Sequence, residues 1–447
     1  MEKERFIVIG GDAAGMSAAS RIRKRQPESD VVVYEAGRYV SYSACGMPFH
    51  IGGVVKDFNS LIHYSVEKFR KERNIEVKLE STVTSIDRKS REITFTSHDK
   101  TGKDHYDHLV IATGASARIP ENLRTLPHVY TLRTLNDLQG FESALDKVKD
   151  VTIVGAGYIG LELAESMRNR DKNVRIVQRS NRILRGFDTQ LSGTIMDEVI
   201  ANKVQILMNT EIKQVVQSEG NLKISLSNGE SLTTQLILVA TGVTPNSNIA
   251  RDSGLELGVA GAIKVNEYME TSDPLIFAAG DVASSYNMIT GREVYMPLAT
   301  GSNKSGRIAG ENAAGGRSKF AGIAGTEVVK VFSLEVGKTG LDHDSALSEG
   351  FDAVSSTITS TSRSSYYPGS SPLTIKMTAD RKSRRVLGAE IIGHEGVAKR
   401  IDVVATAIYS KLTVDDMLGV DYSYSPPFAP TWEPVLVAAD VLSGKLE

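Results

Sequence analysis

The sequence predicts an α/β protein with two doubly wound parallel sheets, followed by a C-terminal α+β segment. Three observations lead to this fold class. A strand–glycine turn–helix–strand unit occurs twice, two apolar strands end in the same Ala-Thr-Gly, and β patterns dominate from about residue 327. The repeated unit is the one that builds parallel sheets with right-handed crossovers. The duplication carries more weight than either copy alone.

Composition limits the classes of protein to which the chain can belong. The 447 residues are 41% apolar and 24% charged with a net charge of −2, which fits a globular protein of several domains and gives no reason to expect a nucleic-acid partner. No apolar run approaches the roughly 20 residues of a membrane span. The chain enters a strand at residue 6, which leaves no room for a signal peptide. A single cysteine builds no disulfide framework, so we expect a cytoplasmic protein.

The two repeated units share the order of apolar strand, glycine turn, helix and second strand. Their strands and helices are expected at residues 6–10, 13–24 and 31–35, and again at 151–155, 161–168 and 174–178. Shorter alternating segments at 75–79 and 93–96 are expected to be antiparallel strands. In the C-terminal part we expect a hairpin around the Ser/Thr-rich run 355–371 and an amphipathic helix at 398–409.

The second glycine turn is a complete G-x-G-x-x-G between a strand and a helix. It reads Gly155-Ala-Gly157-Tyr158-Ile159-Gly160. Its glycines permit a tight turn, close approach of a pyrophosphate and close helix packing, while the helix N-terminus offers free N–H groups. We therefore predict that this turn binds NAD(P).

The strand after this turn ends without the acidic residue that an NAD site normally carries. In its place stand Gln178, then Arg179 and, three residues later, Arg182. With no carboxylate to repel it and two guanidinium groups nearby, a 2′-phosphate should be accepted, so we expect NADPH to work at least as well as NADH. The alternative is that both arginines are solvated loop residues.

The first glycine turn departs from the fingerprint at one position. It reads Gly10-Gly-Asp12-Ala13-Ala-Gly15, so Asp12 stands where the second glycine is expected. A carboxylate next to a pyrophosphate weakens the motif. Glu35 supports it, because an acid at the end of the next strand is well placed to bind ribose hydroxyls. We therefore expect FAD here.

Three further strand ends belong with these turns. Two strands stop at Ala112-Thr113-Gly114 and at Thr241-Gly242, and a third runs into Gly280-Asp281 just before an expected helix. In this order the motifs resemble those of the pyridine nucleotide–disulfide oxidoreductase family, over essentially the whole chain. The resemblance implies that Asp281 hydrogen-bonds the ribityl chain of the flavin.

Cys45, the only cysteine, lies in the segment Ser41-Tyr-Ser-Ala-Cys45-Gly-Met-Pro48. Dithiol members of the family carry C-x4-C, but neither Val40 nor His50 is a cysteine. The redox partner of Cys45 must therefore come from outside as a small thiol, or be an oxidised form of Cys45 itself. If a helix begins after Cys45, its N-terminus would stabilise the thiolate.

The cysteine segment is similar to that of the single-cysteine branch, which comprises coenzyme A–disulfide reductases, NADH oxidases and NADH peroxidases. Peroxide-cleaving members carry a histidine where this chain has Ala13, which argues against peroxidase chemistry. Tyr424-Ser-Pro-Pro looks like the Tyr-x-Pro-Pro of the coenzyme A–disulfide reductases, which implies a homodimer in which Tyr424 of one subunit reaches Cys45 of the other. Tyr366 and Tyr367 resemble a second tyrosine element of that subgroup. The alternative is that these aromatic residues form the core of a dimer interface.

The resemblance also implies a site for coenzyme A. The matching positions lie in the first helix, the cysteine loop, a later helix and the segment after Gly280-Asp281, and they are Arg21, Lys24, Ser41, Arg73, Asn303 and Arg307. The subgroup often has asparagine just before the cysteine, where this chain has Ala44.

These motifs together imply an order of domains and a reaction. We expect an FAD domain at 1–115 and 243–326, an NAD(P) domain at 116–242, and a dimerisation domain at 327–447. NAD(P)H would reduce FAD, which would reduce a mixed disulfide between Cys45 and coenzyme A. The alternatives are an NAD(P)H oxidase, a coenzyme A-persulfide or polysulfide reductase that uses the same cysteine, and a flavin-bound redox sensor without turnover. No metal is expected.

Overall fold

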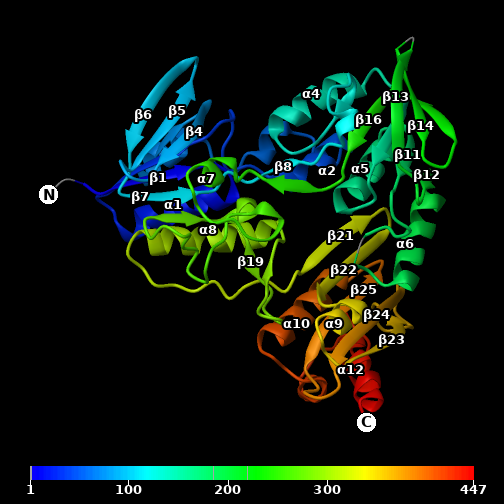
Figure 1. Cartoon of the computed structure of the whole chain (residues 1–447). Coiled ribbons are helices and arrows are strands. Elements are labelled where there is room, and N and C mark those ends of the chain that lie inside the picture. Colours follow the sequence, from blue (N-terminus) through cyan, green and yellow to red (C-terminus); the bar gives the residue numbers. More distant parts are fainter. Residues whose placement is uncertain (1–2, 185, 219) are drawn as a thin grey trace.

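The first parallel sheet forms the left-hand body of the molecule in Figure 1. The computed structural model describes residues 3–184, 186–218 and 220–447. The strand order is β18-β7-β1-β2-β3, with every neighbouring pair parallel. The strands are β1 (Arg5–Ile9), β2 (Asp30–Tyr34), β3 (Glu76–Lys78), β7 (His108–Ile111) and β18 (Ile276–Ala278). Segment 75–79 was expected to be antiparallel, which is wrong: β3 extends the parallel sheet beside β2.

Helices α1 (Ala13–Arg25) and α8 (Ala299–Ala313) lie against each other along this sheet. They approach closely because α8 has glycine at the contact. A Cβ on Gly306 would lie 2.3 Å from the Ala14 carbonyl oxygen, and one on Gly310 would lie 2.3 Å from that of Ala18. The helix expected just after Gly280-Asp281 begins later than predicted. A short 3₁₀ turn, Gly280–Val282, comes first, and α8 starts at Ala299.

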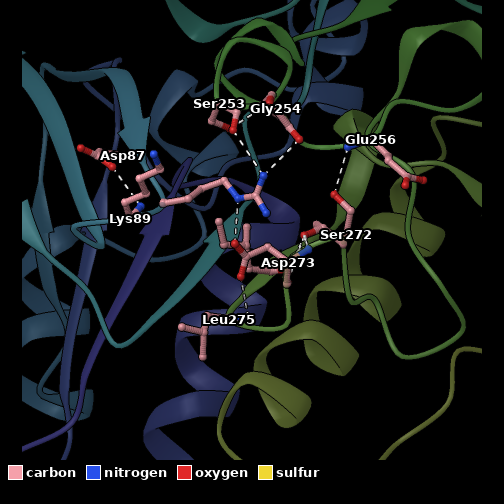
Figure 2. Close-up of polar contacts among 12 residues, drawn as sticks. Asp87, Lys89, Ser253, Gly254, Glu256, Ser272, Asp273 and Leu275 are labelled. Carbon is pink, nitrogen blue, oxygen red and sulfur yellow. Dashed lines mark hydrogen bonds and ion pairs between the residues drawn. The ribbon is translucent and has the colours of Figure 1, made fainter.

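An antiparallel sheet covers the outer end of this body. It consists of β4 (Ser81–Asp87), β5 (Glu92–Ser97) and β6 (Lys100–His105), so the strand expected at 93–96 is confirmed. Arg88 ties this sheet to the segment before β18. Its guanidinium lies 2.7 Å from the Asp273 carboxylate and 3.1 Å from the Gly254 carbonyl oxygen (Figure 2).

The second parallel sheet lies at the upper right of Figure 1, in the strand order β12-β11-β10-β16-β9. Its strands are β9 (Val129–Tyr130), β10 (Asp150–Val154), β11 (Asn173–Val177), β12 (Val204–Leu207) and β16 (Leu236–Val239). The elements beside it are α4 (Leu135–Leu145), α5 (Tyr158–Asn169), α6 (Thr189–Ala201) and the antiparallel strands β13 (Ile212–Ser218), β14 (Asn221–Leu226) and β15 (Ser231–Thr234). The two repeated units are therefore confirmed as two separate parallel sheets.

Two short strands connect these bodies. β8 (Ala115–Ala117) carries the chain out of the first body, and β17 (Val243–Pro245) carries it back, antiparallel to β8. The second body is thus an insertion between β7 and β18 of the first sheet (Figure 1).

The C-terminal part is a five-stranded antiparallel sheet with helices (Figure 1, lower right). Its strands are β21 (Glu327–Val331), β22 (Leu334–Gly340), β23 (Ala353–Thr361), β24 (Pro372–Asp380) and β25 (Val386–Gly393), and its helices are α9 (His343–Ser348), α10 (Val397–Tyr409), α11 (Val414–Leu418) and α12 (Pro434–Lys445). The predicted hairpin around the Ser/Thr-rich run is confirmed, because β23 pairs antiparallel with β24. The predicted amphipathic helix is α10.

A buried polar contact joins this sheet to the second body. The Asp188 backbone N–H, at the start of α6, donates to Glu390 on β25 at 2.7 Å. Glu390 is only 2% exposed, and burial raises the pKa of its carboxyl to about 7. In the described ranges, no helix has both the length and the apolar character needed to cross a membrane.

Candidate active site

A pocket of about 570 Å³ opens between the first body's helices and the cysteine loop. It is lined from α1, from α8, from the loop around Cys45, and from α3 (Val66–Arg73) with the residues before it. The structure brings Cys45 and all six residues predicted to hold coenzyme A to this one pocket: Arg21, Lys24, Ser41, Arg73, Asn303 and Arg307. A thiol and four cationic side chains therefore share a single cavity.

Cys45 lies in a 3₁₀ turn, Ala44–Gly46, directly before the short helix α2 (Met47–Ile51). The thiol is exposed to the pocket, but protein atoms on its other side still desolvate it. This burial raises the pKa of the Cys45 thiol, the charge of Glu162 raises it further, and Arg133 opposes the shift. A helix does begin directly after Cys45, as predicted. Stabilisation of the thiolate by its N-terminus stays a prediction, and desolvation of the thiol acts against it.

The first glycine turn has the geometry of a dinucleotide cradle. Gly10 has φ +107°, and a Cβ on Gly15 would lie 1.8 Å from the Gly10 carbonyl oxygen, so neither position accommodates a side chain. Asp12 is the N-cap of α1 but makes no capping bond, and burial raises the pKa of its carboxyl to about 6. Ala13 begins the helix, so no histidine side chain stands beside the thiol at this position.

Glu35 lies where a ribose-binding acid is expected, and its carboxylate also holds the turn. It accepts the backbone N–H groups of Gly11 and Gly37, each at 2.6 Å. Burial raises the pKa of Glu35. Two of the predicted strand ends belong to neighbouring strands of the first sheet, after β7 and β18, and their glycines Gly114 and Gly280 have φ of +66° and +79°. Of the remaining predicted residues, Ala112 directly follows β7 with its carbonyl oxygen against Gly10, and the Thr113 hydroxyl donates to the Asn246 carbonyl oxygen.

Arg133 was missed by the sequence analysis. It forms an ion pair with Asp281 and donates from Nε to the Ala115 carbonyl oxygen at 2.8 Å. The other Asp281 carboxylate oxygen accepts the Ser302 hydroxyl at 2.8 Å. Arg133 stands in a plain Thr-Leu-Arg-Thr stretch, so no sequence signal marked it.

The second glycine turn repeats this geometry more strictly. Gly155 has φ +106°, and a Cβ on Gly160 would lie 2.0 Å from the Gly155 carbonyl oxygen. Gly157, the N-cap of α5, has open space around it, which leaves the helix N-terminus accessible. Gln178 accepts the Ala156 N–H at 3.0 Å and thereby supports the turn.

The predicted arginines lie on the loop beyond Gln178. The Arg179 side chain is 82% exposed, with Glu211 3.8 Å away as its ion-pair partner. The Arg182 carbonyl oxygen accepts the Gln178 amide at 2.8 Å, which holds the loop against the turn. Thr241 and Gly242 follow β16, and the Thr241 hydroxyl donates to the Arg118 carbonyl oxygen.

Tyr158 and Ile159, the two residues between the last glycines of the second turn, differ in burial. The hydroxyl of Tyr158 is hydrogen-bonded to Glu327 at the start of β21, and burial raises the pKa of that phenol. Ile159 is 41% exposed. One turn further along α5, burial raises the pKa of Glu162 to about 7, and the charge of Glu165 adds to the shift.

Comparison with known proteins identifies the family. The model of the pyridine nucleotide–disulphide oxidoreductases matches residues 4–306, and the model of their dimerisation domain matches residues 326–435. The chain belongs to the pyridine nucleotide–disulphide oxidoreductase family. The predicted family, fold class and assignment to the oxidoreductases are confirmed.

Three relatives are similar over almost the whole chain. An NAD(P)H sulfur oxidoreductase (CoA-dependent) of Pyrococcus furiosus is 38% identical over 99% of this chain and 100% of its own length. A coenzyme A disulfide reductase of Staphylococcus aureus is 31% identical over 95% of this chain and 96% of its own. The crystal structure of reduced Bacillus anthracis CoADR-RHD superposes with a TM-score of 0.97 at 31% identity, covering 100% of this chain and 81% of that one.

The predicted catalytic tyrosines of this oxidoreductase lie in its dimerisation domain and do not line the pocket of the same chain. The Tyr366 and Tyr424 hydroxyls lie 3.5 Å apart, and the two side chains are 74% and 48% exposed. The bond lowers the pKa of Tyr424 and raises that of Tyr366. Tyr367 is less exposed, at 36%, and its ring lies 5.8 Å from the Arg363 guanidinium. The pair that faces outward is therefore Tyr366 with Tyr424.

Proposed function

We propose that this chain is an FAD-containing NAD(P)H oxidoreductase that reduces coenzyme A disulfide through a mixed disulfide on Cys45. The observation that carries the proposal is the pocket in which an exposed thiol shares its walls with Arg21, Lys24, Arg73 and Arg307. Coenzyme A joins a thiol to phosphate groups by a long arm, and guanidinium groups are suited to bind phosphates. The Cys45 thiol in this cavity can react with the sulfur of such a substrate, and the cationic side chains can bind its phosphates.

The first glycine turn fits FAD. Gly10 and Gly15 leave a cradle without side chains, Glu35 stands at the neighbouring strand end for the ribose, and Asp281 lies beside Arg133 at the tip of β18. The second turn fits NAD(P)H, because Gly157 leaves the start of α5 open to a pyrophosphate. We accordingly propose the division into FAD, NAD(P) and dimerisation domains at the boundaries given above.

In the proposed reaction the chain supplies the nucleophile and the binding groups. Cys45 attacks one sulfur of coenzyme A disulfide, forms the mixed disulfide and releases one coenzyme A thiol. When bound, FAD supplies the transfer of the NAD(P)H electron pair to that mixed disulfide, which returns the Cys45 thiolate and the second coenzyme A thiol. The Tyr366–Tyr424 pair of the other subunit in a homodimer would meet the pocket from outside. The single cysteine supports a cytoplasmic location.

A second candidate is a coenzyme A-persulfide or polysulfide reductase. It is favoured by the 38% identity to a relative named a CoA-dependent NAD(P)H sulfur oxidoreductase. The same cysteine and the same pocket would serve this reaction. A persulfide of coenzyme A differs from coenzyme A disulfide only in the group on the outer sulfur, which is a hydrogen in place of a second coenzyme A. Steady-state rates with coenzyme A disulfide and with coenzyme A persulfide decide between the two candidates.

The experiment that tests the proposal is mass spectrometry of the intact protein, before and after treatment with a reductant. The expected result is an adduct of the mass of coenzyme A on Cys45 that reductant removes. The matched control, Cys45→Ser, should carry no adduct. A bare thiol or an added oxygen on wild-type Cys45 after incubation with coenzyme A disulfide would contradict the proposal.

A further inference from the structure

A serine and a histidine in the active-site pocket are paired, and neither belongs to the site described so far. The Ser43 hydroxyl lies 2.7 Å from Nε2 of His63, and both residues line the pocket that contains Cys45. Their backbones are joined as well. The Ser43 N–H donates to the Leu61 carbonyl oxygen at 2.8 Å, and the His63 N–H donates to that of Ser41 at 2.9 Å. The imidazole is therefore held against the cysteine loop by main-chain and side-chain bonds together.

The position of Ser43 connects this pair to the thiol. Ser43 is the N-cap of the 3₁₀ turn that carries Cys45, and its carbonyl oxygen accepts the Gly46 N–H at 3.0 Å. Ser43 is thus bonded both to the turn that carries the thiol and to the imidazole. The imidazole of His63 is therefore bound to a serine two residues before Cys45 in the chain, and all three residues line the same cavity.

The other groups that line the pocket are less suited to supply a proton at neutral pH. Arginine and lysine side chains hold their protons too tightly. Burial raises the pKa of Tyr42, so its hydroxyl also keeps its proton. Burial raises the pKa of the Asp12 carboxyl to about 6, which is still below neutral, so this carboxyl is mostly ionised at pH 7. Histidine is the side chain that commonly acts as a general acid in this pH range.

We propose that the Ser43–His63 pair delivers the proton to the coenzyme A thiolate that leaves when Cys45 attacks the disulfide. This inference rests on the proposed function. In the step, the Cys45 thiolate forms a bond to one sulfur, the bond between the two coenzyme A sulfurs breaks, and the leaving sulfur takes its electron pair. The imidazolium proton then passes to that thiolate, and the imidazole regains a proton from water. Over the full cycle one disulfide, one NAD(P)H and one proton give two thiols and NAD(P)⁺.

The test compares two disulfides with His63→Ala. One is coenzyme A disulfide, whose leaving thiol needs a proton. The other is the mixed disulfide of coenzyme A and thionitrobenzoate, whose aromatic thiol is acidic enough to leave as a thiolate. With coenzyme A disulfide, kcat should fall by about 100-fold with little change in KM, which is the lower end of the range for loss of a general acid. With the thionitrobenzoate disulfide, the variant should be as fast as wild type. Added imidazole should restore part of the rate that the variant loses with coenzyme A disulfide.

Two further variants separate this role from a structural one. Ser43→Ala keeps the imidazole but loses its support, so a smaller loss with the same dependence on the leaving thiol is expected. His105→Gln, on β6 outside the pocket, is the control and should leave both rates unchanged. Equal slowing of both disulfides in His63→Ala, without rescue by imidazole, would overturn the inference. If wild type reduces only the thionitrobenzoate disulfide, coenzyme A disulfide is not the substrate and the proposed function fails. The role of His63 as proton donor would still be supported if, across a series of other disulfides, the loss in His63→Ala depends on the acidity of the leaving thiol.

Discussion

Replacement of Gly310 by alanine tests whether the close contact of α1 and α8 holds the first body together. The added Cβ would lie 2.3 Å from the Ala18 carbonyl oxygen and 2.7 Å from its Cα, which is about 1 Å inside ordinary contact distance. Both atoms belong to backbone, so the two helices must separate. Overpacking of this kind costs up to about 3 kcal/mol, whereas alanine gains about 1 kcal/mol over glycine in a helix. The net expectation is a loss of about 2 kcal/mol.

The assay is thermal unfolding followed by far-ultraviolet circular dichroism. A loss of about 2 kcal/mol should lower the Tm by roughly 4–8 °C for a body of this size. The matched control is Gly140→Ala on α4, where an added Cβ meets nothing within 4 Å, so the same substitution should stabilise the protein slightly. If Gly310→Ala is as stable as Gly140→Ala, the steric argument is refuted.

Three further predictions concern cofactor choice, pH and the tyrosines. The double variant Arg179→Ala with Arg182→Ala should lower kcat/KM for NADPH by about 10-fold and leave that for NADH unchanged, because only NADPH carries a 2′-phosphate; equal losses in initial rates would contradict this. Glu390 ionises near pH 7 when folded and near pH 4 when unfolded, so its carboxyl destabilises the fold as pH rises between these values. Glu390→Gln should therefore exceed wild type in urea unfolding by roughly 2–4 kcal/mol at pH 8 and show no such gain at pH 4. Tyr424→Phe should lower kcat for coenzyme A disulfide by about 10-fold, whereas Tyr367→Phe should leave it unchanged. A loss in Tyr367→Phe without one in Tyr424→Phe would exclude a catalytic role for the Tyr366–Tyr424 pair.

Much of the fold follows from local patterns in the sequence. The glycine turns mark both parallel sheets because only residues without a Cβ fit where Gly15 and Gly160 touch the preceding turn. The strand β3 was expected to be antiparallel but is parallel to β2, since three residues of alternating polarity do not reveal which neighbour they pair with. The direction of a short edge strand depends on the connection before it, here α3, rather than on its own residues.

The candidate site divides in the same way. The residues predicted to bind coenzyme A came from a resemblance to a known family, and the structure brings them to one pocket. The sequence did not predict Arg133 and His63 as site residues, because their roles depend on partners distant in sequence. These partners are Asp281 for Arg133 and the cysteine loop for His63. The raised pKa of Cys45 was missed for a related reason, since desolvation depends on the whole surroundings of the thiol and not on the helix that follows it.

The insertion of the second body between β7 and β18 has a consequence for synthesis on the ribosome. About 165 residues separate the end of β7 from the start of β18, and α8 follows later still. At roughly 5–20 residues per second, the apolar edge of β7 and one face of α1 wait about 10–30 seconds for their partners. The nascent chain therefore exposes an incomplete, apolar sheet while the whole second body is being synthesised. For this reason we expect slower translation of the inserted segment to increase aggregation of the nascent chain.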